Sequence, residues 1–304
     1  MARLLIYDAY ENKVYTYNSL NENDPMPYST ERTLTLREFR GKSGSPVLWT
    51  TIAAMEAWNL TRRKYGKGIP VGYAFRRIWE GGHGTRSQHY AGVAFDVGQS
   101  LTQSQRTAIY RAARSTGAWG YVEPLSQTPT WVHFDRRYGT PACSGTTAGY
   151  PTLRRGSRGC YVMILQDALS TLGYQTGSRI DGLFGTRTEE ALRGYQRRTS
   201  LTVDGVCGCN SWKKITTAVL GIGRSSAVKV ELLCNRWRNP SVTLRVTAPL
   251  IVGPLAWRKA VWFCQGRPLS GAVASRRDGS GGYLLWICRF GLRPFHRLMN
   301  THRP

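Results

Sequence analysis

The spacing of apolar and polar residues predicts short strands and amphipathic helices in the first half of the chain. Residues 2–18 alternate apolar with polar side chains on both sides of a turn at 11–13, which is the pattern of a β-hairpin. The remainder of residues 1–30 is rich in Asn, Pro and Ser and predicts a linker. An apolar stripe of helical spacing then predicts a helix from Pro46 to about Tyr65, because proline suits the first helical turn.

Two short apolar runs farther along predict buried strands. One covers residues 92–97, and the other surrounds His133 in TWVHFDRR. Between them, Thr102 is a suitable cap for a helix at 102–116. The order of strand, helix and strand predicts an α+β domain with a small antiparallel sheet, which we place at residues 31–140.

The run SQHYAGVAFD contains one acid, Asp96, inside a segment that is otherwise small and apolar. Burying a carboxylate alone is very costly, so Asp96 must be paired or must bind a cation. His89, seven residues earlier, and His133 on the second run supply imidazoles. Two histidines and one carboxylate form a known ligand set of catalytic zinc. The alternative is a structural ion pair for Asp96 and a loop position for His89.

This run resembles the S-x-H-x-x-G-x-A-x-D signature of the zinc D-alanyl-D-alanine carboxypeptidase and murein endopeptidase superfamily. The matching residues are Ser87, His89, Gly92, Ala94 and Asp96. WVHFD resembles the second motif of that superfamily, in which a late histidine completes the zinc site. The resemblance covers roughly residues 30–140. It implies a Zn²⁺ cofactor held by His89, Asp96 and His133, with Ser87 in the substrate site.

The strand expected at 69–77 departs from that superfamily at the substrate-binding arginine. Gly72 and Tyr73 match, but the next residue is Ala74. Arg76 or Arg77 could supply a guanidinium for a substrate carboxylate, with Arg76 as the first candidate, since a guanidinium holds a carboxylate through two parallel hydrogen bonds. A solvated surface position is the alternative for Arg76.

The general base also departs from the pattern, because Thr130 stands where an acid is expected three residues before the late histidine. Asp135 is the first substitute, since it lies two residues after His133 and on a strand faces the same side. Glu123 is the second. The alternative for Asp135 is a salt bridge with a neighbouring arginine. His83, on a glycine loop, is expected near the cleft but not among the ligands.

Residues 153–220 contain an internal repeat. Asp181-Gly182-x-x-Gly185 recurs as Asp204-Gly205-x-x-Gly208, each time before a helical pattern. With the apolar stripe that precedes them, these turns predict three short helices. The segment closely resembles the peptidoglycan-binding domain type 1, which implies peptidoglycan as the partner and places it after a linker at 141–152. The two aspartates are expected to shape turns.

The net charge of +24 suits any polyanion, whether nucleic acid, an anionic membrane or a wall polymer. The C-terminal segment 221–304 is the most one-sided part, because positions 222–304 hold 14 Lys and Arg against 2 acids. Its apolar residues show almost no periodicity, so a disordered tail is expected, with a third wall- or membrane-binding module as the alternative.

The seven cysteines form no C-x-x-C pair, which predicts neither a zinc ribbon nor a disulfide scaffold. Cys207 and Cys209 are expected to be isolated buried thiols. The chain has no run of 18 apolar residues, and its first apolar run is too short for a signal peptide. We expect a monomer in the extracellular space or cell wall, reached by phage-type release or non-classical export.

These features predict a zinc metallopeptidase of the endolysin type that hydrolyses peptidoglycan stem peptides. It would act as a D-Ala–D-Ala carboxypeptidase or as a murein endopeptidase. The alternative is a non-catalytic peptidoglycan-binding protein with a degenerate peptidase domain, which Thr130 favours. Nucleic-acid binding rests on charge alone, because the sequence has no basic recognition helix or aromatic RNA-binding motif. No specific nucleic-acid partner is expected.

Overall fold

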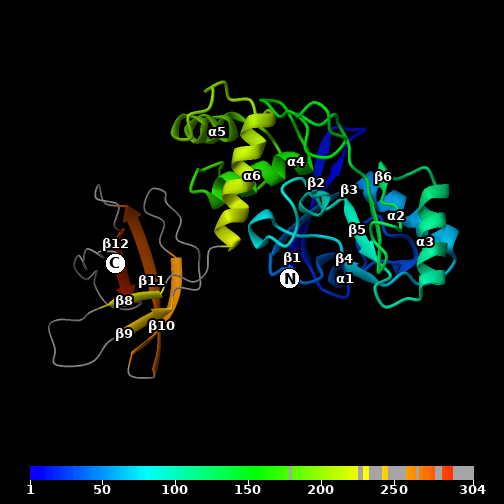
Figure 1. Cartoon of the computed structure of the whole chain (residues 1–304), viewed down its shortest axis with the longest axis horizontal. Coiled ribbons are helices and arrows are strands. Elements are labelled where there is room, and N and C mark those ends of the chain that lie inside the picture. The colour runs from blue at the N-terminus through cyan, green and yellow to red at the C-terminus, as the bar shows by residue number, and fades with distance from the viewer. Residues whose placement is uncertain are drawn as a thin grey trace. The chain divides into compact units, whose positions relative to one another are not determined.

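The computed structural model describes residues 1–177, 180–224 and the backbone of five later strands (Figure 1). By contacts, residues 1–170 and 175–217 form one compact unit, and residues 171–174 and 218–304 form a second. Among the described residues, no helix combines the length and apolarity needed to cross a membrane.

The first sheet has the strand order β2-β1-β3. Strands β1 (Ala2–Asp8) and β2 (Lys13–Leu20) pair antiparallel, which confirms the predicted hairpin. Strand β3 (Val47–Thr51) pairs parallel with β1. The predicted helix therefore begins later than Pro46, at α2 (Ile52–Tyr65). The stretch VLWTT is β-branched and aromatic, and its pairing with β1 outweighs the helical start signal of the proline.

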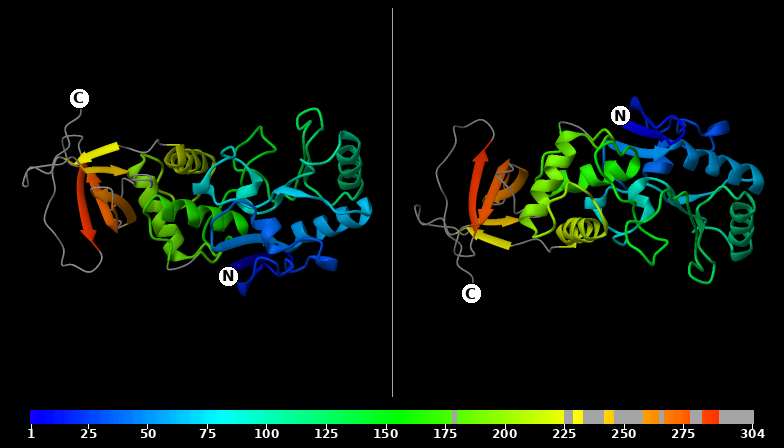
Figure 2. Two further views of the ribbon diagram at one scale, coloured as in Figure 1. Left: turned by 90° about the horizontal axis from the view of Figure 1, so that it is seen from below. Right: turned by 90° about the horizontal axis from the view of Figure 1, so that it is seen from above.

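The second sheet is antiparallel throughout and has the order β4-β5-β7-β6. Its strands are β4 (Val71–Tyr73), β5 (Ala94–Val97), β6 (Tyr121–Val122) and β7 (Val132–Asp135). Helix α3 (Gln103–Ser115) begins behind Thr102, whose hydroxyl accepts from the Gln105 amide, and packs on α2 (Figure 2). The register places Asp96 directly opposite His133.

Short helices complete this part of the chain. They are helix α1 (Leu36–Arg40) and three 3-10 turns, η1 (Thr30–Arg32), η2 (Ile78–Glu80) and η3 (Gln88–Ala91). The core between the two sheets is aromatic. Its members are at most 1% exposed: Phe39, Trp49, Trp58, Phe75, Phe95 and Phe134.

Gly92 ends η3 and lies against β3. Its φ is +67°, and a Cβ there would lie 1.9 Å from the Trp49 carbonyl oxygen. Any side chain would push η3 away from β3. Because η3 carries His89, this close approach fixes the height of that imidazole above the sheet.

The predicted repeat domain (residues 153–220) forms three helices, α4 (Cys160–Thr171), α5 (Thr186–Arg198) and α6 (Cys209–Arg224). One buried glutamine serves each repeat turn. Gln166 Nε2 donates to Asp181 Oδ1 at 2.8 Å, and Gln196 Nε2 donates to Asp204 Oδ1 at 2.8 Å. The Gly205 amide donates back to Gln196. Both aspartates are thus turn residues, as the repeat predicts.

The repeat domain packs directly on the first domain (residues 31–140), and it does not hang on a free linker. Helix α4 supplies Asp167, which accepts from Arg77 Nε at 2.7 Å, and Tyr161, which donates to Gln88 Oε1 at 2.9 Å. A disulfide joins Cys143 in the linker to Cys209 at the start of α6. The expectation of isolated thiols is therefore wrong for Cys209, although Cys207 is a buried free thiol.

Beyond α6 the structure describes five strands, β8 (Lys229–Leu232), β9 (Val242–Arg245), β10 (Arg258–Cys264), β11 (Arg267–Arg277) and β12 (Tyr283–Arg289). Strands β8 and β9 pair, and β10-β11-β12 form a second small sheet. The other residues of the predicted tail lie outside the described residues. Whether the tail as a whole is ordered stays a prediction.

Candidate metal centre

A cavity of about 410 Å³ opens beside β5 and β7, and six of the seven predicted site residues line it. These six are Ser87, His89, Asp96, Glu123, His133 and Asp135. The antiparallel register of β5 and β7 brings Asp96 and His133 together, and η3 delivers His89 from the side. The strand pairing that the sequence predicts is thus what assembles the cluster.

The His89 ring is oriented by a backbone carbonyl. Its Nδ1 lies 2.7 Å from the Ala74 oxygen, which can only accept, so Nδ1 carries a proton. Its Nε2 then faces Asp96 Oδ2 at 3.3 Å. The lone pair of His89 Nε2 and the Asp96 carboxylate repel each other at this distance, so a proton or a cation must lie between them. Two ligands of a tetrahedral zinc, each at about 2.0–2.1 Å, also lie about 3.3 Å apart.

Asp96 is the shared partner of two imidazoles. Its Oδ1 lies 2.6 Å from His133 Nδ1. Burial would raise the pKa of Asp96, but hydrogen bonds with His133 and His89 outweigh it and hold the pKa below its ordinary range. No Lys or Arg pairs with Asp96 among the described residues. The carboxylate is therefore ionised and balanced by imidazoles alone.

His133 is held from both sides. Its Nε2 lies 3.3 Å from Asp135 Oδ2, opposite the Nδ1 contact with Asp96. Burial would lower the pKa of His133, but the hydrogen bonds with Asp135 and Asp96 raise it to about 9. A ligand imidazole whose second nitrogen faces a carboxylate is a recurrent arrangement in metal sites. Asp135 thus orients His133.

Asp135 is fully buried and engaged by Arg137, which favours the salt-bridge alternative over the predicted role as base. The Arg137 Nε donates to Asp135 Oδ1 at 2.7 Å, and its Nη2 donates to Oδ2. Burial would raise the pKa of Asp135, but the Arg137 and His133 hydrogen bonds lower it. A buried carboxylate bound at both oxygens is a poor proton acceptor.

Glu123 is the better-placed acid. Its backbone amide donates to the His133 carbonyl at 2.9 Å, so the residue sits beside the cluster at the cavity wall. Within residues 1–221, no hydrogen bond or ion pair engages its carboxylate. It can therefore accept a proton from a group in the cavity.

His83 belongs to the same cluster, although the sequence placed it only near the cleft. Its ring stacks on His89 with centroids 4.3 Å apart, and it lines the cavity. Burial and the neighbouring His89 lower the pKa of His83 to about 4. The spacing of six residues before His89 gave no signal, because the intervening loop could have turned either way.

The two predicted substrate-binding residues have different outcomes. Arg76 donates through Nε to the Gly81 carbonyl at 3.2 Å and is absent from the cavity lining, so its predicted role as carboxylate binder is not supported. Arg86 lines the cavity instead and donates to Thr146. Ser87 lines it too, and its hydroxyl accepts from the His89 amide at 3.3 Å as the cap of η3.

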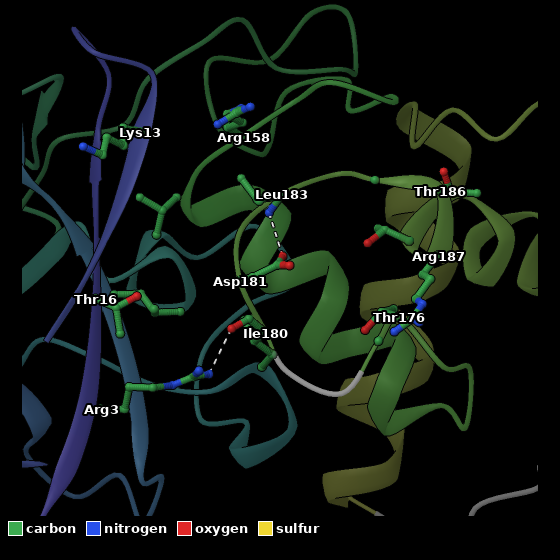
Figure 3. A pocket seen from close by; sticks show the side chains of 15 residues that line it. Arg3, Lys13, Thr16, Arg158, Thr176, Ile180, Asp181, Leu183, Thr186 and Arg187 are labelled. Atoms are coloured by element: carbon green, nitrogen blue, oxygen red, sulfur yellow. Dashed lines mark hydrogen bonds between the residues drawn. The ribbon is translucent and has the colours of Figure 1, made fainter. Parts of the chain in front are cut away.

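A second cavity, of about 630 Å³, lies between the β1–β2 hairpin and the repeat domain (Figure 3). Four cationic side chains line it, namely Arg3, Lys13, Arg158 and Arg187. Arg3 Nη2 donates to the Ile180 carbonyl at 2.9 Å and so ties the hairpin to the repeat domain (Figure 3). The acid in this lining, Asp181, is held by Gln166.

Residues 158–215 match the family model described as "Putative peptidoglycan binding domain". The chain therefore contains a peptidoglycan-binding domain, which covers the repeat domain. The chain is 49% identical over 47 residues to N-acetylmuramoyl-L-alanine amidase CwlM of Mycobacterium tuberculosis. That match covers 16% of this chain and 11% of the amidase. The chain is 38% identical over 66 residues to the spore cortex-lytic enzyme of Bacillus cereus, covering 22% and 25%.

Among solved structures, the SleB N-terminal domain is 34% identical, with a TM-score of 0.22, over 22% of this chain and 92% of that one. The chain spans a quarter or less of the length of the amidase and of the cortex-lytic enzyme. Both matches have the length of one small domain and fall on the binding domain. The His–Asp cluster (His83, His89, Asp96 and His133) is therefore interpreted from its own geometry.

Proposed function

We propose that this protein is a peptidoglycan hydrolase, a zinc peptidase that cleaves stem peptides and is held on the cell wall by its binding domain. The observation that carries the proposal is the pair of His89 Nε2 and Asp96 Oδ2, 3.3 Å apart in an open cavity. No Lys or Arg among the described residues pairs with Asp96, and the two atoms lie at the spacing of two zinc ligands. The peptidoglycan-binding domain supports peptidoglycan as the substrate. The resemblance of the run at 87–96 to the zinc peptidase signature supports peptide hydrolysis as the reaction.

His89, Asp96 and His133 would hold the ion, and the donor set of two imidazoles and one carboxylate fits Zn²⁺. Zinc bound there would polarise the scissile carbonyl and make a water acidic enough to attack at neutral pH. Glu123, at the cavity wall, would accept the proton of the attacking water and pass it to the leaving amine. Asp135 keeps the His133 ring in position through Nε2.

The substrate is a peptide with free carboxylates, and two arginines line the cavity, Arg86 and Arg137. Arg137 is committed to Asp135, whereas Arg86 reaches the cavity from an exposed loop. Arg86 thus takes the place expected of Arg76. Both the terminal D-Ala–D-Ala bond and an internal stem or cross-bridge bond remain within the proposal. The cationic second cavity suits an anionic wall polymer.

A non-catalytic wall-binding protein is the second candidate, and one observation favours it. Thr130 stands where the superfamily has an acid, and Asp135 is locked by Arg137. If Glu123 cannot replace them, the domain binds peptidoglycan without cleaving it. In either case the protein acts at the cell wall or outside the cell.

The test is digestion of purified peptidoglycan by the full chain, followed by mass analysis of the products, with and without a chelator. We expect chelator-sensitive release of stem-peptide fragments, lost in His89→Ala and in Glu123→Gln. Glu190→Gln, an exposed acid on α5, is the matched control and should cleave normally. Wall binding without any zinc-dependent product would refute the peptidase and leave the binding protein.

A further inference from the structure

The side chain of His83 has a buried nitrogen that the proposed zinc site does not use. Its Nε2 is shielded from solvent and has no hydrogen-bond partner among the residues that the structure describes. Nearly all buried polar atoms in folded proteins are hydrogen-bonded, so such an atom calls for an explanation. A missing cation explains it directly, because a neutral imidazole nitrogen is a metal ligand.

The position of His83 agrees with a ligand role. One ligand atom each from His83, His89 and Asp96 all lie within 4.8 Å of one another. Two donors at about 2.0–2.1 Å from one ion can be up to about 4.2 Å apart, so small side-chain shifts suffice for all three to reach it. The His83 ring stacks on the His89 ring, with 21° between their planes and 4.3 Å between their centroids.

The backbone of His83 is held in place, although it lies on a glycine loop. The Tyr90 hydroxyl accepts from the His83 amide at 3.1 Å and donates to the His83 carbonyl at 3.0 Å. The Tyr73 ring meets the imidazole edge-on with centroids 4.9 Å apart. These contacts aim the imidazole at Asp96, which is the preorganisation that a ligand needs.

We propose that His83 is a fourth protein ligand of the ion held by His89, Asp96 and His133. This inference rests on the proposed zinc site. Catalytic zinc sites usually have three protein ligands and one open position, so a fourth ligand closes the resting shell. His83 must then yield its place when substrate enters. Gly81 and Gly82, with φ of +65° and +90°, precede it and allow that movement.

The test measures the metal itself, not turnover. The full chain, stripped with a chelator, is titrated with Zn²⁺ against a chromophoric competitor and with Co²⁺ by visible absorption. Wild type should bind one ion with the intense absorption of four-coordinate cobalt. His83→Gln should weaken binding at least about tenfold, the lower edge of what loss of even an outer-shell partner costs, and should lose that band intensity.

Two further variants keep this test informative if His83→Gln misfolds. His83→Glu restores a donor at similar reach and should recover most of the affinity. Thr85→Ala, on the same exposed loop, should match wild type. Equal affinity and equal spectra in wild type and His83→Gln would overturn the fourth ligand and leave the zinc peptidase standing. A wild-type chain that binds no ion would overturn both.

Discussion

Two carboxylates in this molecule, Asp167 and Asp96, are paired in opposite ways. Asp167, on α4 where the repeat domain meets the first domain, is 2% exposed and is bound at both oxygens by Arg77. Asp96, on β5, faces a cavity, and its ion-pair partners among the described residues are the imidazoles of His89 and His133. A guanidinium is charged at every physiological pH, whereas an imidazole is not.

The difference separates a structural acid from one that belongs to a site. Arg77 balances the charge of Asp167 without help from any ligand. Its Nη1 also donates a hydrogen bond to the Ser45 hydroxyl at 2.7 Å. No Lys or Arg pairs with Asp96 in the part of the chain that the structure describes, so its compensation depends on protons or on a metal. We therefore expect substitutions of Asp167 to affect mainly stability and substitutions of Asp96 to affect mainly metal binding.

The largest effect is expected at Asp167. Asp167→Ala leaves the Arg77 guanidinium buried without its partner, and breaking a buried pair in this way costs about 3–5 kcal/mol of unfolding free energy. Urea denaturation of the full chain, followed by far-UV circular dichroism, measures the loss. The matched control is Glu189→Ala, which breaks the solvent-screened pairs with Arg155 and Arg193 and should change stability far less.

Replacing both partners tests the same point from the other side. The double variant Arg77→Met with Asp167→Leu removes both charges and fills the space with apolar atoms, so it should recover most of the stability lost in Asp167→Ala. A double variant as unstable as the single one would mean that the pair also specifies how α4 packs.

The next effect is metal-linked and should appear at Asp96, not at Asp167. Zinc at 100 times its dissociation constant should add about 2.7 kcal/mol to the unfolding free energy, because it binds the folded state. Asp96→Asn should abolish this gain, and it should also destabilise the metal-free protein, because it removes one of the carboxylates that raise the pKa of His133. Thermal unfolding with zinc or with chelator measures both values. A zinc-dependent gain that survives in Asp96→Asn would place the ion elsewhere.

A smaller effect is expected where α4 supports the cluster. Tyr161→Phe removes the hydroxyl that donates to Gln88 Oε1 at 2.9 Å, next to His89. A buried acceptor left without its donor costs about 1–3 kcal/mol. Zinc affinity should also fall in Tyr161→Phe, since Gln88 holds the turn that carries His89. Unchanged affinity with lower stability would show that the binding domain supports the fold but not the site.

Much of the fold and cluster could be predicted because the signals were local. The alternation of apolar and polar residues predicted the hairpin of β1 and β2, and the apolar runs predicted β5 and β7. The pairing register of β5 and β7 then places Asp96 opposite His133. The repeat gave the two glycine turns. Each of these depends on neighbours within a few residues, which sequence periodicity records directly.

The errors arose where distant contacts decide. Strand β3 pairs with β1, which lies more than forty residues earlier, so Pro46 misled the helix start. The disulfide joins Cys143 to Cys209, 66 positions apart. The roles of Asp135 and His83 stay predictions, and they depend on the Arg137 side chain and on the path of the loop that carries His83. Side-chain direction on a loop leaves no periodic trace, so sequence reasoning could not choose between these outcomes.

The pH dependence of the metal-free protein gives the finest separation of the two acids. The pKa of His133, raised to about 9 by Asp135 and Asp96 against burial, means that the folded state binds this proton more tightly than the unfolded state does. Its contribution is complete below an unfolded pKa of about 6.5 and is lost as pH rises through about 9. The pKa of His83, lowered to about 4, acts only on the acid side of that window.

In chelator, the melting temperature of wild type should therefore fall by a few degrees between pH 6.5 and 9.5, since about 1 kcal/mol shifts a chain of this size by about 2–4 °C. His133→Asn should flatten this slope, whereas Asp167→Asn should lower the whole curve without changing its shape, because Arg77 does not titrate there. A slope that survives in His133→Asn would assign the proton to another group and would remove the contrast between a carboxylate balanced by imidazoles and one balanced by arginine.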